Sequence, residues 1–176
     1  MARHAVLPVI DVDLFYFSDG FTYSSVNNEY KRTIWDVMIG LPLSRKGRWV
    51  LGWNYGSLTF SDSPGGTETS LTVSDMGPEL SYYLNRDRTL EISFVYNIIT
   101  KGTYNPGGDS TELRGTSMRV EVGYLPQITD SLLMGAKLNY YKATFNEEVT
   151  GQTTLSQVTH SRTVIYPSFA FTLRWD

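Results

Sequence analysis

Eight separate segments of this chain alternate apolar and polar residues one by one, and this period of two is the feature that most constrains its fold. In the second segment, for example, Trp35, Val37 and Ile39 lie on one face of an extended chain, and Asp36 and Met38 lie on the other. Such alternation is typical of a β-strand with two different faces. The sequence therefore predicts eight strands, near residues 9–17, 33–43, 49–60, 73–84, 89–100, 116–125, 132–145 and 163–175.

The connections between these segments alternate in length. The short ones cover 43–48, 85–89 and 125–131, and the long, polar ones cover 18–32, 61–74, 101–116 and 146–162. Two long connections contain Pro-Gly-Gly, at Pro64 and Pro106, which is typical of a turn. In an up-and-down sheet the odd and even connections lie at opposite ends, so one end of the barrel would have short turns and the other would have long loops. We therefore expect a closed eight-stranded antiparallel up-and-down transmembrane β-barrel with a polar lumen, forming one domain over residues 1–176.

The two faces of the segments favour a transmembrane barrel over a soluble one. Their apolar faces contain no charged residue, although 19% of the chain is charged. An eight-stranded barrel is only just wide enough for side chains to fill, so large residues such as Trp53, Phe94 and Phe171 are expected to point outward into lipid. A helical membrane protein is excluded, because no run approaches the roughly 20 apolar residues that a spanning helix requires. A soluble, ligand-carrying barrel of lipocalin type, with an apolar cavity, is the alternative fold.

The opposite, polar faces are expected to form a charged network in the lumen. Because a bare buried charge is unfavourable, these groups would have to pair, hydrogen-bond, hydrate or bind protons. We interpret the network as polar filling that fixes strand register, with an ion or proton path as the alternative. Its predicted members are Asp11, Asp13, Asp36, Glu79, Glu91, Arg119, Glu121, Lys137 and Arg174.

Aromatic residues near the strand ends suggest girdles at two membrane surfaces, because amphipathic rings favour that position. A sugar-binding platform is the alternative. The lipid-facing and girdle residues are Trp35, Trp49, Trp53, Tyr82, Phe94, Tyr96, Tyr124, Tyr140, Phe169, Phe171 and Trp175, and we also place Tyr16 and Tyr141 in the girdles.

Six cations near the bases of the long connections could contact the phosphates of lipopolysaccharide, since Lys and Arg bind phosphate well. Alternatively, they only keep the loops soluble. These residues are Lys31, Arg32, Lys101, Arg114, Lys142 and Arg162.

Few residues suit catalysis or metal binding. The chain has no cysteine and two histidines, so we expect no metal site and no cofactor. His160 and Ser161, with Glu147 and Glu148, have the residue types of a hydrolytic triad, but adjacent residues of a strand face opposite ways. We assign no catalytic residue. A net charge of −3 without a basic stripe argues against a nucleic-acid partner.

The ending Phe169-Ala170-Phe171-Thr172-Leu173-Arg174-Trp175-Asp176 resembles the alternating aromatic final strand of small bacterial outer-membrane barrels. Across the whole chain, the architecture is similar to that of outer-membrane protein X, the transmembrane domain of outer-membrane protein A and the outer-membrane protein W group. The resemblance implies location in a bacterial outer membrane and recognition by the barrel-assembly machinery. In that class the aromatic is usually the last residue, whereas here Asp176 follows it. Met1 to Pro8 lacks an apolar signal segment, so we expect the mature form of an exported protein.

The function expected from these features is a structural or surface-interaction role in the outer membrane, with possible lipopolysaccharide contact. A narrow pore for small solutes is the first alternative, and a lipid-modifying enzyme is the second. Pro78 and Pro167 lie inside predicted strands although proline cannot donate to a strand ladder. We expect bulges there, or positions above the lipid.

Overall fold

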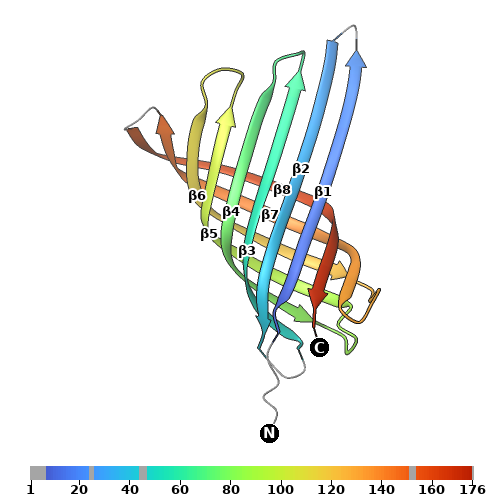
Figure 1. Cartoon of the computed structure of the whole chain (residues 1–176). Coiled ribbons are helices and arrows are strands. Elements are labelled where there is room, and N and C mark those ends of the chain that lie inside the picture. The colour runs from blue at the N-terminus through green and yellow to red at the C-terminus, as the bar shows by residue number, and fades with distance from the viewer. Residues whose placement is uncertain (1–6, 24–25, 44–46, 151–153, 176) are drawn as a thin grey trace.

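The computed structural model describes residues 7–23, 26–43, 47–150 and 154–175, and in this part of the chain it contains strands and no helix. Eight antiparallel strands follow one another in sequence order and close into a single ring (Figure 1). The strands are β1 (Val9–Tyr23), β2 (Val26–Pro42), β3 (Trp49–Pro64), β4 (Thr69–Tyr83), β5 (Leu90–Asn105), β6 (Thr111–Tyr124), β7 (Leu132–Thr150) and β8 (Thr154–Arg174). The predicted all-β, up-and-down, ring-closed architecture is therefore confirmed. None of the described segments forms a helix long and apolar enough to cross a membrane.

The prediction of four long polar connections is wrong, because most of their residues continue the strands. The strands are 14 residues long in β6 and 21 in β8, and short connections join β3 to β4 and β5 to β6 at the far end. Both Pro-Gly-Gly sequences do form turns, with positive φ at Gly65, Gly66 and Gly107. Residues 24–25 and 151–153, in the other two expected connections, lie outside the described residues. The polar composition suggested loops, but Thr-rich segments also favour extended chain.

The ring is closed along only part of its height. β1 and β8 pair from Val9 with Arg174 to Leu14 with Phe169, and no pairing joins the remaining described residues of these two strands. Beyond this seam the β1–β2 hairpin and the β7–β8 hairpin diverge to opposite sides (Figure 1). β1 begins and β8 ends at the same end of the barrel, beside the short connections.

The two prolines lie in different strand environments. The β4–β5 register shifts between Met76 and Glu79, so Pro78 lies in the bulge that the sequence predicts. Pro167 pairs with Leu138 on β7 without a register shift there, so no bulge forms. It lies two residues beyond Phe169, the last β8 residue paired with β1. A residue without an N–H group is tolerated here because one side of β8 has become an edge.

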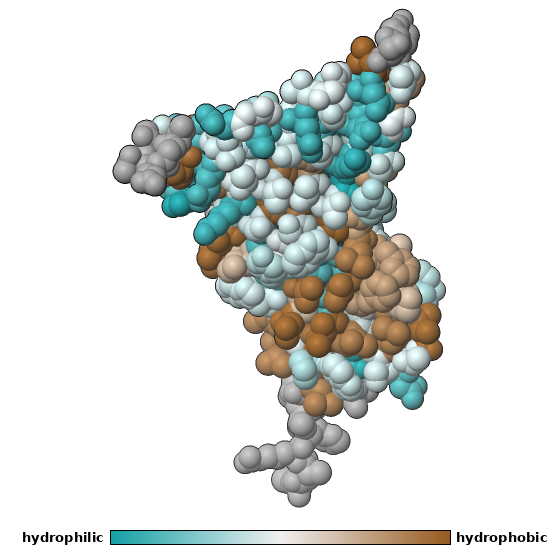
Figure 2. Space-filling view, turned by 45° about the horizontal axis from the view of Figure 1, so that its top comes forward, coloured by the Kyte–Doolittle hydropathy of each residue, from teal (hydrophilic) through white to brown (hydrophobic). Residues whose placement is uncertain are grey.

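The barrel has two sections with opposite side-chain polarity. We call the part next to the chain ends the closed section and the part beyond it the hairpin section. The boundary follows Tyr16, Trp35, Tyr55, Met76, Ile98, Met118, Tyr140 and Ile165. In the closed section, exposed apolar side chains cover the outside, and the space-filling view shows them as a continuous apolar zone (Figure 2). On the face that Figure 2 shows, polar residues cover most of the hairpin section.

The interior shows the reverse arrangement. The closed section buries the charged side chains, whereas the largest apolar cluster begins at the boundary and fills the hairpin section. Smaller apolar clusters, around Met38 and Leu133, lie nearer the end with the short connections. The main cluster contains Ile34, Leu58, Phe60, Val73, Leu113, Tyr141, Ala143, Phe145 and Tyr166.

Candidate functional site

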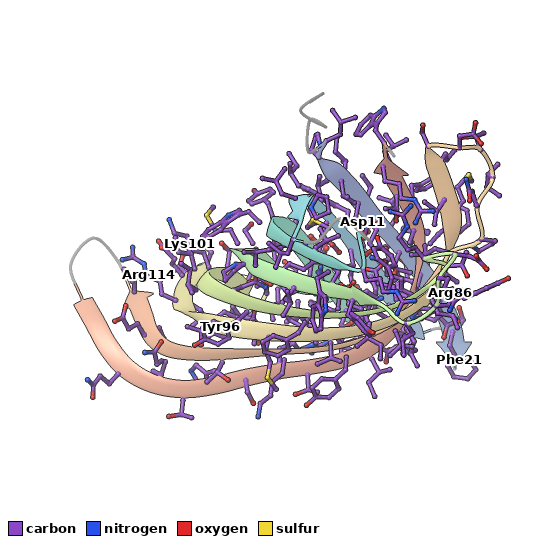
Figure 3. The ribbon with its side chains drawn as sticks, turned by 90° about the horizontal axis from the view of Figure 1, so that it is seen from below. Asp11, Phe21, Arg86, Tyr96, Lys101 and Arg114 are labelled. Atoms are coloured by element: carbon purple, nitrogen blue, oxygen red, sulfur yellow. The ribbon has the colours of Figure 1, made fainter. Side chains whose placement is uncertain are left out.

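A network of buried charges fills the middle of the closed section. All nine charged residues predicted for the lumen are buried, with 1 to 4% of each residue exposed. Figure 3 shows Asp11 among the interior side chains that the strands surround. Asp75, at 2% exposure, is a tenth member that the sequence did not suggest. The buried side chains thus include seven carboxyls, counting Asp75, and three basic groups.

Arg119 on β6 connects the two sides of the barrel. Its Nη2 donates to Asp36 Oδ1 on β2 at 2.6 Å, and its Nε forms an ion pair with Glu121. Asn54 on β3 donates to Asp36 and to Glu79 on β4, each at 3.1 Å. This chain of contacts crosses the lumen from β6 to β4. Charge-assisted bonds of this kind hold their partners in one geometry, so the network fixes the relative positions of four strands.

Lys137 on β7 is the second centre of the network. Its Nζ forms an ion pair with Asp11 and donates to Asp13 at 2.9 Å and to Glu121 at 3.2 Å. The three carboxylates lie close enough together to surround a metal ion. The Lys137 ammonium lies within hydrogen-bonding distance of all three. The arrangement therefore satisfies the acids with a cation from the chain itself.

Neutral polar residues complete the network and were not predicted as members of it. Tyr141 Oη donates to Asp75 Oδ2 at 2.6 Å, and Thr172 Oγ1 donates to Asp11 Oδ1 at 2.5 Å. Our placement of Tyr141 in the girdle is wrong, because this residue is fully buried. Asp75 lies inside the predicted fourth strand, residues 73–84, but was not included among the inward charges. It is two residues before Gly77, so the alternation of that strand places it on the same, inner face.

The eleven residues predicted to face lipid or form girdles all lie on the outward face. Phe94, Trp53 and Tyr124 are 48, 49 and 59% exposed. Rings also pack against each other across strands: the centroids of Trp49 and Tyr82 are 4.5 Å apart. The outward surface of the closed section is therefore apolar and rich in aromatic rings.

The six predicted phosphate-binding cations fall into two groups. Lys31, Lys101, Arg114 and Lys142 lie on the outward face beyond the apolar zone. Lys31 pairs with Glu29 at 2.9 Å, and Arg114 pairs with Glu112 at 2.9 Å. Arg32 and Arg162 differ, because alternation along β2 and β8 places them on the inner face.

The outward cations border a polar groove. A depression of about 560 Å³ lies on the outside of the hairpin section, and Lys101 lies in its lining. Arg114 is the register partner of Lys101, and Figure 3 shows the two close together, on the opposite side of this view from Arg86. The remaining lining residues are Thr72, Ser74, Thr103, Ser110, Glu112 and Val149.

The residue types of a hydrolytic triad are not assembled into one. His160 Nε2 lies 3.5 Å from Glu148 Oε2, so these two side chains do meet. Ser161 follows His160 directly on β8 and alternates to the other face of the strand. The arrangement supplies a His–Glu pair and no aligned nucleophile.

A scan against protein-family models and a search of the curated proteins found no match to this chain. The class that the fold defines is an eight-stranded, up-and-down, ring-closed antiparallel barrel.

Proposed function

We propose that this chain is a bacterial outer-membrane β-barrel whose closed section spans the lipid and whose hairpin section stands outside it as a surface-interaction structure. The observation that carries the proposal is the reversal of polarity along the barrel. Apolar side chains cover the outside of the closed section and fill the inside of the hairpin section. Apolar groups avoid water in both sections only if the closed section is surrounded by lipid and the hairpin section by water.

The dimensions are consistent with this placement. A transmembrane strand needs about 9 to 11 residues, and the strands of this barrel have 14 to 21. The surplus residues belong to the hairpin section. Its outward face carries hydroxyl groups, at Thr33, Thr59, Thr72 and Thr144 for example, where a soluble barrel carries polar residues.

Native and introduced tryptophans can test the membrane position. Trp53 is 49% exposed on the closed section, and Thr72 lies on the outside of the hairpin section. We compare two single-Trp proteins, one retaining Trp53 and the other carrying Thr72→Trp, in vesicles whose lipids bear bromine atoms on the acyl chains. Bromine is expected to quench Trp53 strongly and the Thr72→Trp residue little. Equal quenching at both positions, or none at Trp53, would contradict the proposal.

We also propose that the outward cationic face of the hairpin section contacts lipopolysaccharide. Lys101, Arg114 and Lys142 lie directly beyond the apolar zone, where the phosphates of an outer leaflet would lie. No carboxylate forms an ion pair with the described Lys101 or Lys142 side chain, so their ammonium groups are accessible to phosphate. The groove beside Lys101 adds hydroxyl groups that can hydrogen-bond to sugar or phosphate oxygens.

A matched pair of variants tests this contact. Lys101→Ser with Lys142→Ser removes two cations from the outward face, and Arg48→Ser with Arg86→Ser removes two from the end with the short connections. Binding of purified lipopolysaccharide to vesicle-inserted protein is expected to weaken several-fold for the first pair only. Equal binding by both double variants would refute the lipopolysaccharide contact and leave the membrane position unaffected.

A further inference from the structure

An apolar cavity of about 480 Å³ lies at the mouth of the hairpin section, on the inner side of β4 to β8. Leu71, Leu113 and Phe145 line it, and the last two belong to the main apolar cluster. Tyr104 and Pro106 contribute from β5 and the turn that follows it. Small-molecule sites have volumes of about 300 to 1,000 Å³ and combine such walls with a few polar groups. The cavity is thus large enough for a short alkyl chain.

The polar side of this cavity includes a guanidinium group, that of Arg162. The guanidinium carbon of Arg162, which lines the cavity, lies 4.3 Å from the centroid of the Phe60 ring, and that of Arg32 lies 5.5 Å from the same centroid. Asp62 forms an ion pair with Arg32. Two guanidinium groups therefore share this one carboxylate. Burial and the nearby Arg32 lower the pKa of Arg162, although Asp62 partly opposes this effect.

Arg162 also has a donor without a partner. Its Nε is buried and forms no hydrogen bond. A buried unsatisfied donor is unfavourable, and an anionic oxygen is the strongest acceptor for a guanidinium. The other acid at the cavity, Glu148, lies 3.5 Å from His160. The cavity thus combines apolar walls with a guanidinium that lacks a full counter-charge.

We propose that this cavity binds a small amphiphile with one carboxylate group, its alkyl tail between Leu71, Leu113 and Phe145 and its carboxylate at Arg162. The inference goes beyond the surface role proposed above. It concerns the inner face of the hairpin section, whereas the lipopolysaccharide contact concerns the outer face. The two proposals therefore stand or fail separately.

Octanoate is a suitable probe, because it is soluble and short enough for the cavity. Three ligands with the same tail are titrated into the folded, vesicle-inserted protein: octanoate, 1-octanol and octyltrimethylammonium. Methyl NMR signals of Leu71 and Leu113 report binding in the cavity, and those of Leu138, which is 57% exposed on the outside, report partitioning into lipid. We expect octanoate to shift the cavity signals with a dissociation constant near 1 mM, or about −4 kcal/mol, and octyltrimethylammonium to bind at least tenfold more weakly.

A matched pair of variants locates the charge. Arg162→Gln is expected to weaken octanoate binding about tenfold and to leave 1-octanol unchanged. Arg114→Gln, which removes an outward guanidinium, is expected to change neither. Equal affinity of the wild-type protein for octanoate and octyltrimethylammonium would overturn the proposal, and this comparison does not depend on any variant folding. So would shifts at Leu138 without shifts at Leu71 and Leu113.

Discussion

Replacing Arg119 with Met tests whether the buried network holds the closed section together. The substitution keeps much of the side-chain length and removes the guanidinium. Asp36, at 3% exposure, would then keep only its bond from Asn54, and Glu121 would keep only its contact with Lys137. An uncompensated buried carboxylate is far more unfavourable than the intact pair is favourable.

The expected loss in the free energy of unfolding is about 3 to 5 kcal/mol, the range seen when one partner of a buried ion pair is removed. At about 1.4 kcal/mol for each factor of ten, the unfolding constant rises at least a hundredfold. Urea titration of the vesicle-inserted protein, followed by tryptophan emission and by heat-modifiable gel mobility, measures this change.

Two comparison proteins separate this explanation from general damage. Arg114→Met breaks an exposed pair with Glu112 and is expected to change the unfolding free energy by no more than about 1 kcal/mol. Adding Asp36→Asn to Arg119→Met removes one buried carboxylate that has lost its cation, and is expected to restore part of the lost stability. If Arg119→Met is no less stable than Arg114→Met, or if the added Asp36→Asn destabilises further, the reasoning is refuted.

Four further outcomes are expected. Val122→Arg on the apolar outside lowers the free energy of unfolding by about 2 to 4 kcal/mol, whereas Thr144→Arg beyond the boundary changes it by less than about 1 kcal/mol. Equal effects of the two variants in urea titrations would argue against a lipid boundary between these positions. Gly135→Ala destabilises by about 1 to 3 kcal/mol, because its Cβ would lie 1.9 Å from the Tyr124 carbonyl oxygen, while Gly20→Ala has open space and stays near neutral. Phe60→Ala costs about 3 to 5 kcal/mol locally, and hydrogen exchange should rise in the hairpin section while heat-modifiable mobility remains. In planar bilayers the protein should show no steady conductance, because side chains from opposite strands meet across the lumen; stable channels would instead support the narrow pore.

Alternation was sufficient to predict the ring of strands and the inward charges. Asp11, Asp36, Glu91 and Lys137 each lie between two outward apolar neighbours in the sequence. Because side chains alternate with a period of two, each of the four must point inward. The pairing of these groups could not be predicted. Which carboxylate meets Arg119 or Lys137 depends on the stagger between strands, and that stagger follows from bulges such as the one at Pro78 and from the close approach of backbones at Gly77 and Gly135.

The hairpin section was misread because its composition and its pattern point to different structures. Around Ser61 and Ser74 the residues are polar and small, as in loops, and no single apolar run stands out. The strand signal is nevertheless present, with alternate apolar residues at Leu58 and Phe60 and at Leu71 and Val73. The difference from the closed section is that these apolar residues lie on the inner face of the strand, whereas in the closed section most apolar residues lie on the outer face.

On β3, apolar residues occupy odd positions from Leu51 to Tyr55 and even positions from Leu58, and the exchange takes place across Gly56 and Ser57. No register shift with β2 or β4 occurs at that point, so the strand continues while its apolar residues move to the other face. β7 shows the same exchange between Tyr140, which is outward, and Tyr141, which is inward. An uninterrupted strand has no geometric reason to make this exchange, since its side chains alternate regularly. Under the membrane position proposed above, the cause is a change in the surroundings at that height. The exchange of faces would then mark in the sequence the level at which this barrel leaves the lipid.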